Sequence, residues 1–258
     1  MQAFDLLILN WVNQFSNLDL TFDKTVYVIA DNHLLKGGVI MGLLWWVWMR
    51  NGASFVKPGL HAARTIAGTL LAILVARAMQ NLLPGRLRPM QEPTLDFLMP
   101  YGDHPPGIVE LSSFPSDHAV MFFALSTALF FAGRAIGVAA YIWTVVVICL
   151  PRIYLGYHYP SDIIAGALVG VLIMIAVMRV PLPSMIPNML GRFQVRHPGL
   201  VFAGVFLLTL QMSTMFENSR RLLAGAAQVF LKTEQGPDVS VADKCPGQAL
   251  SAERNCLD

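Results

Sequence analysis

The chain has few charged residues. Asp, Glu, Lys and Arg make up 13% of its 258 residues, whereas 55% are hydrophobic, and the mean hydropathy is +0.56. Soluble domains carry roughly 25% charged residues, so this composition is typical of a membrane protein, whose lipid-facing surface needs no charge. The formal net charge of +2 is too small to indicate a nucleic-acid partner.

Cysteine is also scarce, and its spacing excludes the usual metal-binding pairs. Cys149 lies in an apolar run, and Cys245 and Cys256 lie in a polar C-terminal tail. His and carboxylate residues form no metal-type cluster either, so we expect neither a metal nor another cofactor. The N-terminus lacks the basic and long apolar regions of a signal peptide.

The first 33 residues contain too many carboxylates for a spanning helix, and we expect them to lie in the membrane interface. Residues 4–18 predict an amphipathic helix with apolar side chains on one face. These apolar residues are Phe4, Leu7, Ile8, Trp11, Phe15 and Leu18.

Long apolar runs dominate residues 34–216 and predict an all-α, polytopic membrane helix bundle. The six expected transmembrane helices are 34–49, 62–83, 118–132, 135–150, 161–178 and 199–216. A Pro-rich loop of about thirty residues separates the second from the third, and a loop of that length is usually functional. Gly166 and Gly170 predict close helix packing. Residues 217–258 form a polar tail.

The distribution of Lys and Arg predicts which side each loop occupies. Loops 50–64, 133–134 and 179–198 contain seven Lys and Arg residues and no acidic residue. The positive-inside rule places them in the cytoplasm and the Pro-rich loop, the 152–162 segment and both termini outside. In an oxidising periplasm, Cys245 and Cys256 could form a disulfide; free thiols or pairing between chains are the alternatives.

The segment from Arg152 to Asp162 concentrates polar chemistry between two apolar runs. His158 precedes Asp162 by four residues, which suggests an imidazole oriented by a carboxylate. The Arg152 guanidinium suits phosphate oxygens. The segment therefore indicates phosphoryl chemistry at a membrane surface. The alternative is an interfacial loop with aromatic anchors and an ion pair.

Two further segments complete a recognisable pattern: Arg88-Pro89, and Pro115-Ser116-Asp117-His118. With the 152–162 segment they resemble the three-part signature of the type 2 phosphatidic acid phosphatase (PAP2) family. That signature is a Lys seven residues before Arg-Pro, then Pro-Ser-Gly-His, then Ser-Arg with a His six residues on and an Asp four further. The resemblance covers roughly residues 62–178 and implies the same helix-bundle core.

The chain departs from the family pattern at three positions. Asn81 stands in place of the Lys, Asp117 in place of the Gly, and Pro151 in place of the Ser. In having Asp at this position, the chain resembles bacterial members of the family that are similar to undecaprenyl pyrophosphate phosphatases. An amide brings no charge to a phosphate, and Arg77 or Arg86 is a candidate to supply it; the alternatives are a bundle-interior role for Arg77 and a headgroup contact for Arg86.

The resemblance implies catalytic roles for three residues. His158 would attack phosphorus and form a phosphohistidine, Asp162 would hold its other ring N–H, and His118 would protonate the leaving oxygen and then activate water. Phosphate oxygens would be bound by side chains and backbone N–H groups at the start of the third span. The expected phosphate-binding residues are Arg88, Arg152, Ser116, Asp117 and Asn81.

The favoured function is therefore a metal-independent lipid phosphatase of the bacterial inner membrane, with its site facing the periplasm and undecaprenyl pyrophosphate as substrate. Phosphatidate, phosphatidylglycerophosphate or a lipid A phosphate are alternative substrates. A lipid phosphotransferase, and a binding or transport protein without catalysis, are the competing classes. The expected partners are the lipid substrate and membrane lipids, and the oligomeric state is open.

Overall fold

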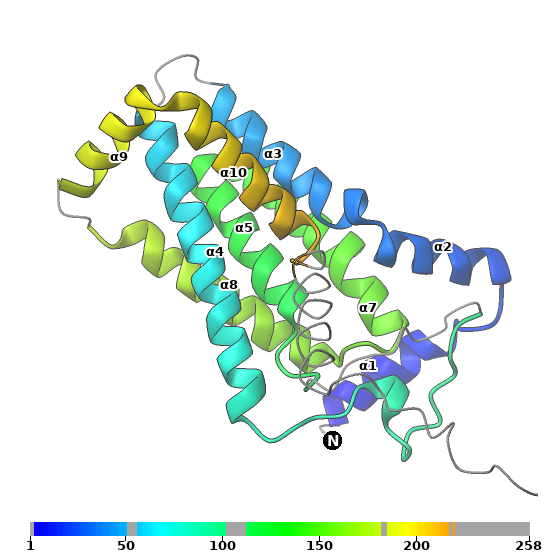
Figure 1. The fold of residues 1–258 in the computed structure, drawn as a ribbon. Coiled ribbons are helices and arrows are strands. Elements are labelled where there is room, and N and C mark those ends of the chain that lie inside the picture. The colour runs from blue at the N-terminus through cyan, green and yellow to red at the C-terminus, as the bar shows by residue number, and fades with distance from the viewer. Residues whose placement is uncertain (1–2, 51–55, 102–111, 182–184, 217–218, 220–258) are drawn as a thin grey trace, which may run out of the picture. The chain divides into compact units, whose positions relative to one another are not determined.

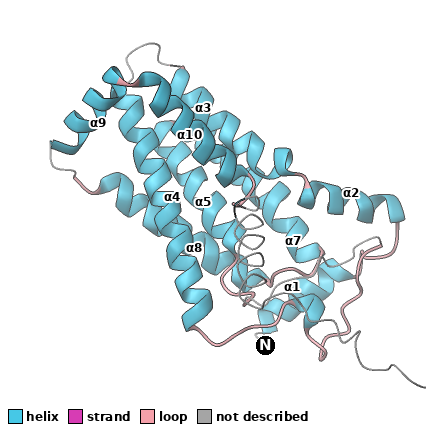
Figure 2. Cartoon of the chain, in the orientation of Figure 1, coloured by secondary structure: helices cyan, strands magenta, loops and turns pink. Residues whose placement is uncertain are grey.

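The computed structural model describes residues 3–50, 56–101, 112–181, 185–216 and 219, and its regular elements within these ranges are helices (Figures 1 and 2). The chain divides into two compact units, Met1–Phe216 and Glu217–Asp258. The named helices belong to the first unit. The predicted Cys245–Cys256 disulfide lies outside the described residues.

The helices before the site are α1 (Ala3–Asn13), α2 (Leu20–Asp31), the π-helical turn η1 (Leu34–Gly38), α3 (Val39–Met49) and α4 (Val56–Leu82). The 3-10 turn η2 (Pro89–Gln91) interrupts the following loop. The remaining helices are α5 (Asp117–Ala132), α6 (Arg134–Trp143), π-helical η3 (Thr144–Cys149), α7 (Leu150–Tyr154), α8 (Pro160–Arg179), α9 (Met185–Arg196) and α10 (Pro198–Ser213). All six predicted spans are helical, and Pro160 occupies the expected first position of α8.

Helix α5 forms the centre of the bundle, in contact with α3, α4, α6 and α8. Its sequence is apolar all round, as expected for a helix that is covered on every side. Two glycines let α8 approach it closely. A Cβ added at Gly170 would lie 2.2 Å from the Val120 carbonyl oxygen, and one added at Gly166 would lie 2.7 Å from the Ser116 carbonyl oxygen. The predicted packing role of both glycines is confirmed.

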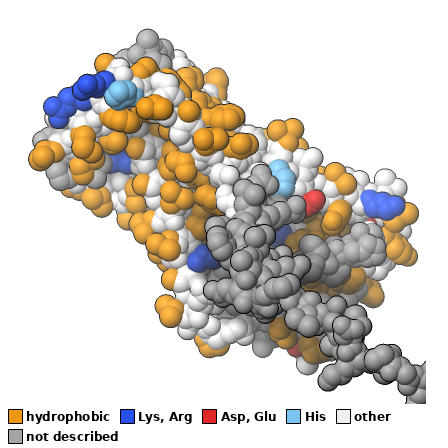
Figure 3. Space-filling view, viewed as in Figure 1, with side chains coloured by type: hydrophobic (Ala, Val, Ile, Leu, Met, Phe, Trp, Pro, Cys, Tyr) orange, Lys and Arg blue, Asp and Glu red, His pale blue; other side chains and the backbone are white. Residues whose placement is uncertain are grey.

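Among the described residues, three helices are long and apolar enough to cross a membrane: Gly59–Leu82, Arg134–Tyr154 and Pro160–Arg179. Helices α9 and α10 form a pair bent by 108° that could be a fourth span. The predicted spans at 34–49 and 118–132 are shorter apolar helices, so the count of six remains a prediction. Apolar side chains cover much of the face in Figure 3, and basic ones gather near α9.

The N-terminal helix is shorter than predicted, because α1 ends at Asn13 and the chain then turns through Asn17, whose φ is +63°. Most of the predicted apolar face points outward, since Leu7 and Trp11 are 71% and 62% exposed, whereas Leu9 is buried. The side that faces the protein instead carries Asp5 and Asn13. An exposed apolar face agrees with the expected interfacial position.

Candidate active site

The three sequence motifs meet at one end of the bundle. Arg88 follows α4, the second motif starts α5, and His158 lies in the connection from α7 to α8. The Ser116 N–H donates to the Asp162 carbonyl oxygen at 3.1 Å, which holds the two helix starts together. Ser116 is also the N-cap of α5, where its hydroxyl accepts from the Ala119 N–H at 3.5 Å.

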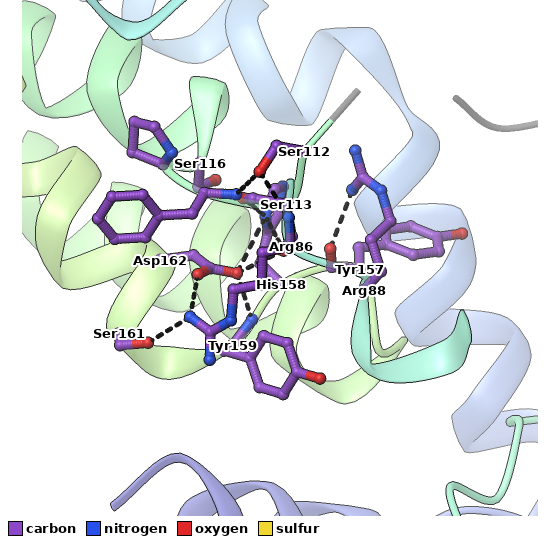
Figure 4. A network of polar contacts seen from close by, with 12 residues as sticks. Arg86, Arg88, Ser112, Ser113, Ser116, Tyr157, His158, Tyr159, Ser161 and Asp162 are labelled. Atoms are coloured by element: carbon purple, nitrogen blue, oxygen red, sulfur yellow. Dashed lines mark hydrogen bonds and ion pairs between the residues drawn. The ribbon is translucent and has the colours of Figure 1, made fainter. Parts of the chain in front are cut away.

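Asp162 is fully buried and accepts hydrogen bonds from three residues of the site (Figure 4). Its Oδ2 accepts from the Ser113 hydroxyl at 2.5 Å and from the Tyr159 N–H at 2.9 Å. Its Oδ1 accepts from Arg86 Nη1 at 2.6 Å. These donors on both oxygens hold the carboxylate in one orientation.

The His158 ring is oriented by a backbone carbonyl. Nδ1 lies 3.0 Å from the Ser113 carbonyl oxygen, which can only accept, so Nδ1 carries the proton. Asp162 Oδ2 lies farther away, 3.8 Å from Nδ1, so its effect on the ring is largely electrostatic. This tautomer leaves the lone pair on Nε2. Desolvation lowers the pKa of His158, and the Asp162 carboxylate opposes that shift; the ring is therefore neutral at neutral pH.

The turn before His158 needs a glycine. Gly156 has a φ of +69°, which side chains rarely tolerate, and a Cβ there would lie 2.6 Å from the Phe97 ring. The Gly156 carbonyl oxygen accepts from the Met90 N–H at 3.2 Å. This contact joins the Pro-rich loop to the histidine turn.

Arg88 and Arg152 bracket the histidine turn. Arg88 Nη1 donates to the Tyr157 carbonyl oxygen at 2.9 Å, and within the described part of the chain its Nε is buried with no hydrogen-bond partner. Arg152 donates to the carbonyl oxygens of Ile148 and Ala30, at 2.7 and 3.2 Å. Desolvation lowers the pKa of Arg88, but a guanidinium remains charged at neutral pH.

The two arginines considered as substitutes for the motif Lys are both paired with carboxylates. Arg77 Nη2 lies 2.6 Å from Asp117 Oδ2. Arg86 binds Asp162 and also Asp5, whose Oδ2 lies 2.7 Å from Arg86 Nη2. Asn81 is solvent-exposed at the end of α4. Asp117 is therefore turned toward α4, and Asn81 is apart from the contacts that join the other motif residues.

Sequence reasoning missed three residues at this site. Ser113 contacts both His158 and Asp162, and Asp5 reaches the site from α1. Lys36, on η1, is buried and lies close enough to His118 for their charges to interact, as do Arg88 and Arg152. A lone acidic residue among apolar residues was the available signal for Asp5. Nothing local in the sequence marks Lys36. Within the described ranges, no three His, Cys, Asp or Glu side chains group as metal ligands.

Comparisons with known proteins identify the family of this chain. The family model described as the PAP2 superfamily matches residues 65–185. The undecaprenyl-diphosphatase BcrC of Bacillus subtilis (strain 168) is 30% identical over 167 residues, which are 63% of this chain and 76% of that protein. The chain belongs to the PAP2 superfamily. The resemblance drawn from the three motifs is therefore confirmed, and with it the expectation of a PAP2-type phosphatase.

Two other proteins are similar to this chain over a short stretch or at low identity. The bacitracin transport permease protein BcrC of Bacillus licheniformis is 41% identical over 63 residues, which are 24% of this chain and only 30% of that protein. A PAP2 type phosphatidylglycerolphosphate phosphatase from Bacillus subtilis matches 67% of this chain and 92% of its own, with 18% identity and a TM-score of 0.32.

Proposed function

We propose that this PAP2 protein hydrolyses a lipid diphosphate, undecaprenyl diphosphate, through a phosphohistidine on His158 at the outer face of the membrane. The observation that carries the chemistry is the fixed tautomer of His158. A ring that donates from Nδ1 to the Ser113 carbonyl oxygen at 3.0 Å presents Nε2 as a nucleophile. The lowered pKa of His158 keeps this lone pair free of a proton.

In the first step, Nε2 attacks the terminal phosphorus and the bond from phosphorus to the bridging oxygen breaks. His118 gives its proton to that oxygen, so the lipid monophosphate leaves. In the second step, water attacks the phosphohistidine, His118 takes the proton of the water, and inorganic phosphate is released. The positive charge that develops on the His158 ring is stabilised by the nearby Asp162 carboxylate.

The charge needed by the phosphate comes, in this proposal, from Arg88, Arg152 and Lys36. The unpartnered Nε of Arg88 supports this, because a buried donor ordinarily has an acceptor, and a phosphate oxygen would supply one. Arg77 and Arg86 are already neutralised by carboxylates. The starts of α5 and α8 add backbone N–H groups and favourable helix dipoles.

The substrate and the face rest on separate support. The relative that is 30% identical over most of its length is named for undecaprenyl diphosphate hydrolysis. The positive-inside rule supports the outer face, because the basic loops lie at the opposite end of the helices. There Arg64 binds the carbonyl oxygens of Met178 and Val180 at the end of α8, at 2.7 and 2.8 Å.

The test is phosphate release from a panel of lipid phosphates by purified protein in detergent with a chelator. Undecaprenyl diphosphate should be the best substrate, and His158→Ala should be inactive. Rapid quenching at alkaline pH, where the P–N bond of a phosphohistidine survives, should trap a ³²P label from the substrate on wild type. The matched control is His197→Ala, an exposed histidine outside the site, which should keep full activity. A folded His158→Ala protein with near-normal turnover would refute the mechanism.

The face is tested by cysteine labelling in intact cells, with both tail cysteines replaced by serine. Gly85 and Gly199 each have open space around the Cα and lie at opposite ends of the bundle. Gly85→Cys should react with a membrane-impermeant maleimide, and Gly199→Cys should react only after permeabilisation. The reverse pattern would place the site in the cytoplasm.

A further inference from the structure

Asp5 of α1 is a buried carboxylate that has no part in the two steps proposed above. Its Oδ1 accepts from the Ser161 N–H at 2.9 Å, and its Oδ2 accepts from the Ser161 hydroxyl at 2.8 Å and from Arg86 at 2.7 Å. The same guanidinium donates to Asp162 through its other terminal nitrogen at 2.6 Å. One cation therefore bridges two fully buried carboxylates, and one of these carboxylates faces the nucleophile.

The charges of this group do not cancel. Asp5 and Asp162 contribute two negative charges and Arg86 one positive charge, so the group has a net charge of −1. Without Asp5, Arg86 and Asp162 would form a neutral pair, and the developing His158 imidazolium would face no net negative charge. Buried charges are weakly screened, so the balance within the group matters at the ring.

We propose that Asp5 is a positioning residue for catalysis: it neutralises Arg86, so that Asp162 keeps its negative charge for His158. Arg86 then acts as an orienting group for the carboxylate, held over the Tyr159 ring with its Cζ 3.9 Å from the ring centroid. This inference rests on the proposed phosphohistidine function and adds the N-terminal helix to the catalytic apparatus.

Helix α1 does not need Asp5 for docking. Asn13 exchanges two hydrogen bonds with the Leu98 backbone, at 2.8 and 2.9 Å, and Leu9 packs in a core cluster with Ile153 and Ile163. A purely structural anchor would also not need a cation shared with the catalytic carboxylate. The arrangement therefore favours an electrostatic role over an anchoring one.

The chain offers a matched control in Asp23 of α2. This carboxylate is also fully buried and also accepts three hydrogen bonds, from the Asn17 N–H, the Tyr101 N–H and the Tyr154 hydroxyl. It is joined to neither Arg86 nor Asp162. Asp23→Asn tests the loss of a buried N-terminal carboxylate without changing the charge at His158.

Asp5→Asn should lower kcat by about 10- to 100-fold, with KM changed less. This is the range found when residues that orient the side chains bound to a metal are replaced, and Asp5 would act in the same indirect way. Asp23→Asn should stay within about threefold of wild type at a comparable loss of melting temperature. Asp5→Glu, which keeps the charge, should be more active than Asp5→Asn. Full activity of folded Asp5→Asn would overturn the inference.

A double-mutant cycle of Asp5 and Arg86 separates the electrostatic role of Asp5 from an anchoring role. In Asp5→Asn, Arg86→Gln should raise activity by at least about fivefold, a coupling within the range of contacting residues, because Asp162 regains its uncompensated charge. The double variant should also exceed Arg86→Gln alone, which leaves two buried carboxylates without a cation. If the double variant is no better than either single variant, the residues only anchor α1 and the inference fails. If Asp5→Asn does not fold alone, the comparison of the double variant with Arg86→Gln still distinguishes the two roles of Asp5.

The pH profile gives an independent readout. The charged and titratable groups that act on His158 are Asp162, Arg88, Arg152 and His118. Loss of the net negative charge should move the acid limb of kcat/KM to lower pH in Asp5→Asn and leave it in place in Asp23→Asn. An unmoved limb in Asp5→Asn would count against the inference. Wild-type protein that releases no phosphate from any lipid would instead refute the proposed function.

Discussion

The hydroxyl of Ser113 is the shortest link between the catalytic carboxylate and the segment that orients the histidine. Ser113→Ala removes the 2.5 Å hydrogen bond to Asp162 Oδ2. It leaves in place the backbone carbonyl that accepts from His158 Nδ1 at 3.0 Å. The substitution therefore removes a donor to Asp162 and a long contact of 3.5 Å between the hydroxyl and His158 Nδ1, and it keeps the closer backbone acceptor of the imidazole.

The expected magnitude follows from the kind of bond that is lost. A hydrogen bond to a charged group contributes about 1.5–3 kcal/mol, which corresponds to about 12- to 160-fold in rate if all of it is expressed in the transition state. Asp162 keeps Arg86 and the Tyr159 N–H as donors. We therefore expect a loss near the lower end, about tenfold in kcat, with KM nearly unchanged because Ser113 does not touch the phosphate in the proposed mechanism.

The assay is steady-state phosphate release from undecaprenyl diphosphate in detergent, with melting temperature as the check on folding. Ser112→Ala is the matched control, because among the described residues the Ser112 hydroxyl accepts from the backbone N–H groups of Arg86 and Phe114, at 3.1 and 3.3 Å, and does not bind Asp162. It should lower stability without a comparable loss of kcat. Equal kinetic losses in the two variants, or a folded Ser113→Ala with unchanged kcat, would refute the reasoning.

Three further outcomes are expected. Arg77→Ala should lower activity only a few-fold, because its ion pair is partly exposed and worth at most about 1 kcal/mol. Lys36→Gln should lower activity about a hundredfold if Lys36 stabilises the phosphoryl group. Steady-state kinetics of the two variants tests this contrast. The acid limb of kcat/KM should lie below pH 6.5, since neutral His158 is the active form and desolvation lowers its pKa; a limb above that value would contradict the assignment. Gly170→Ala should lower the melting temperature, at a cost of about 1–3 kcal/mol for overpacking, because the new Cβ would meet the Val120 carbonyl oxygen at 2.2 Å.

Most of the helical architecture could be predicted because long apolar runs and their Gly and Pro boundaries are local signals. Gly133 ends α5 and starts α6 as the sequence suggested. Helix α9 was not predicted, since Pro187 and Gly191 interrupt its apolar residues and its arginines indicated only a basic loop. Helix α2 was missed because its carboxylates indicated only an interfacial segment, whereas one of them, Asp23, is buried by contacts with residues far along the chain.

The three motifs could be predicted from spacing, but their partners could not. The pairing of Arg77 with Asp117 depends on how α4 packs beside α5, and the sequence left open whether Arg77 or Arg86 carries the missing charge. Ser113 was overlooked because its carbonyl oxygen, which orients His158, is a backbone group present at any residue. The expected direct bond from Asp162 to the ring is replaced by a separation of 3.8 Å.

The close contact of α5 with α8 has a consequence for how a lipid can enter. A Cβ at Gly166 or Gly170 would collide with backbone atoms, so α5 and α8 are in direct contact. We do not expect these two helices to separate during the catalytic cycle. In the proposed mechanism, His118 at the start of α5 and His158 before α8 therefore keep a fixed spacing through both half-reactions. In the proposed mechanism, a lipid substrate must therefore reach the site past the elements that surround α5 and α8, and we expect any gating motion there rather than between these two helices.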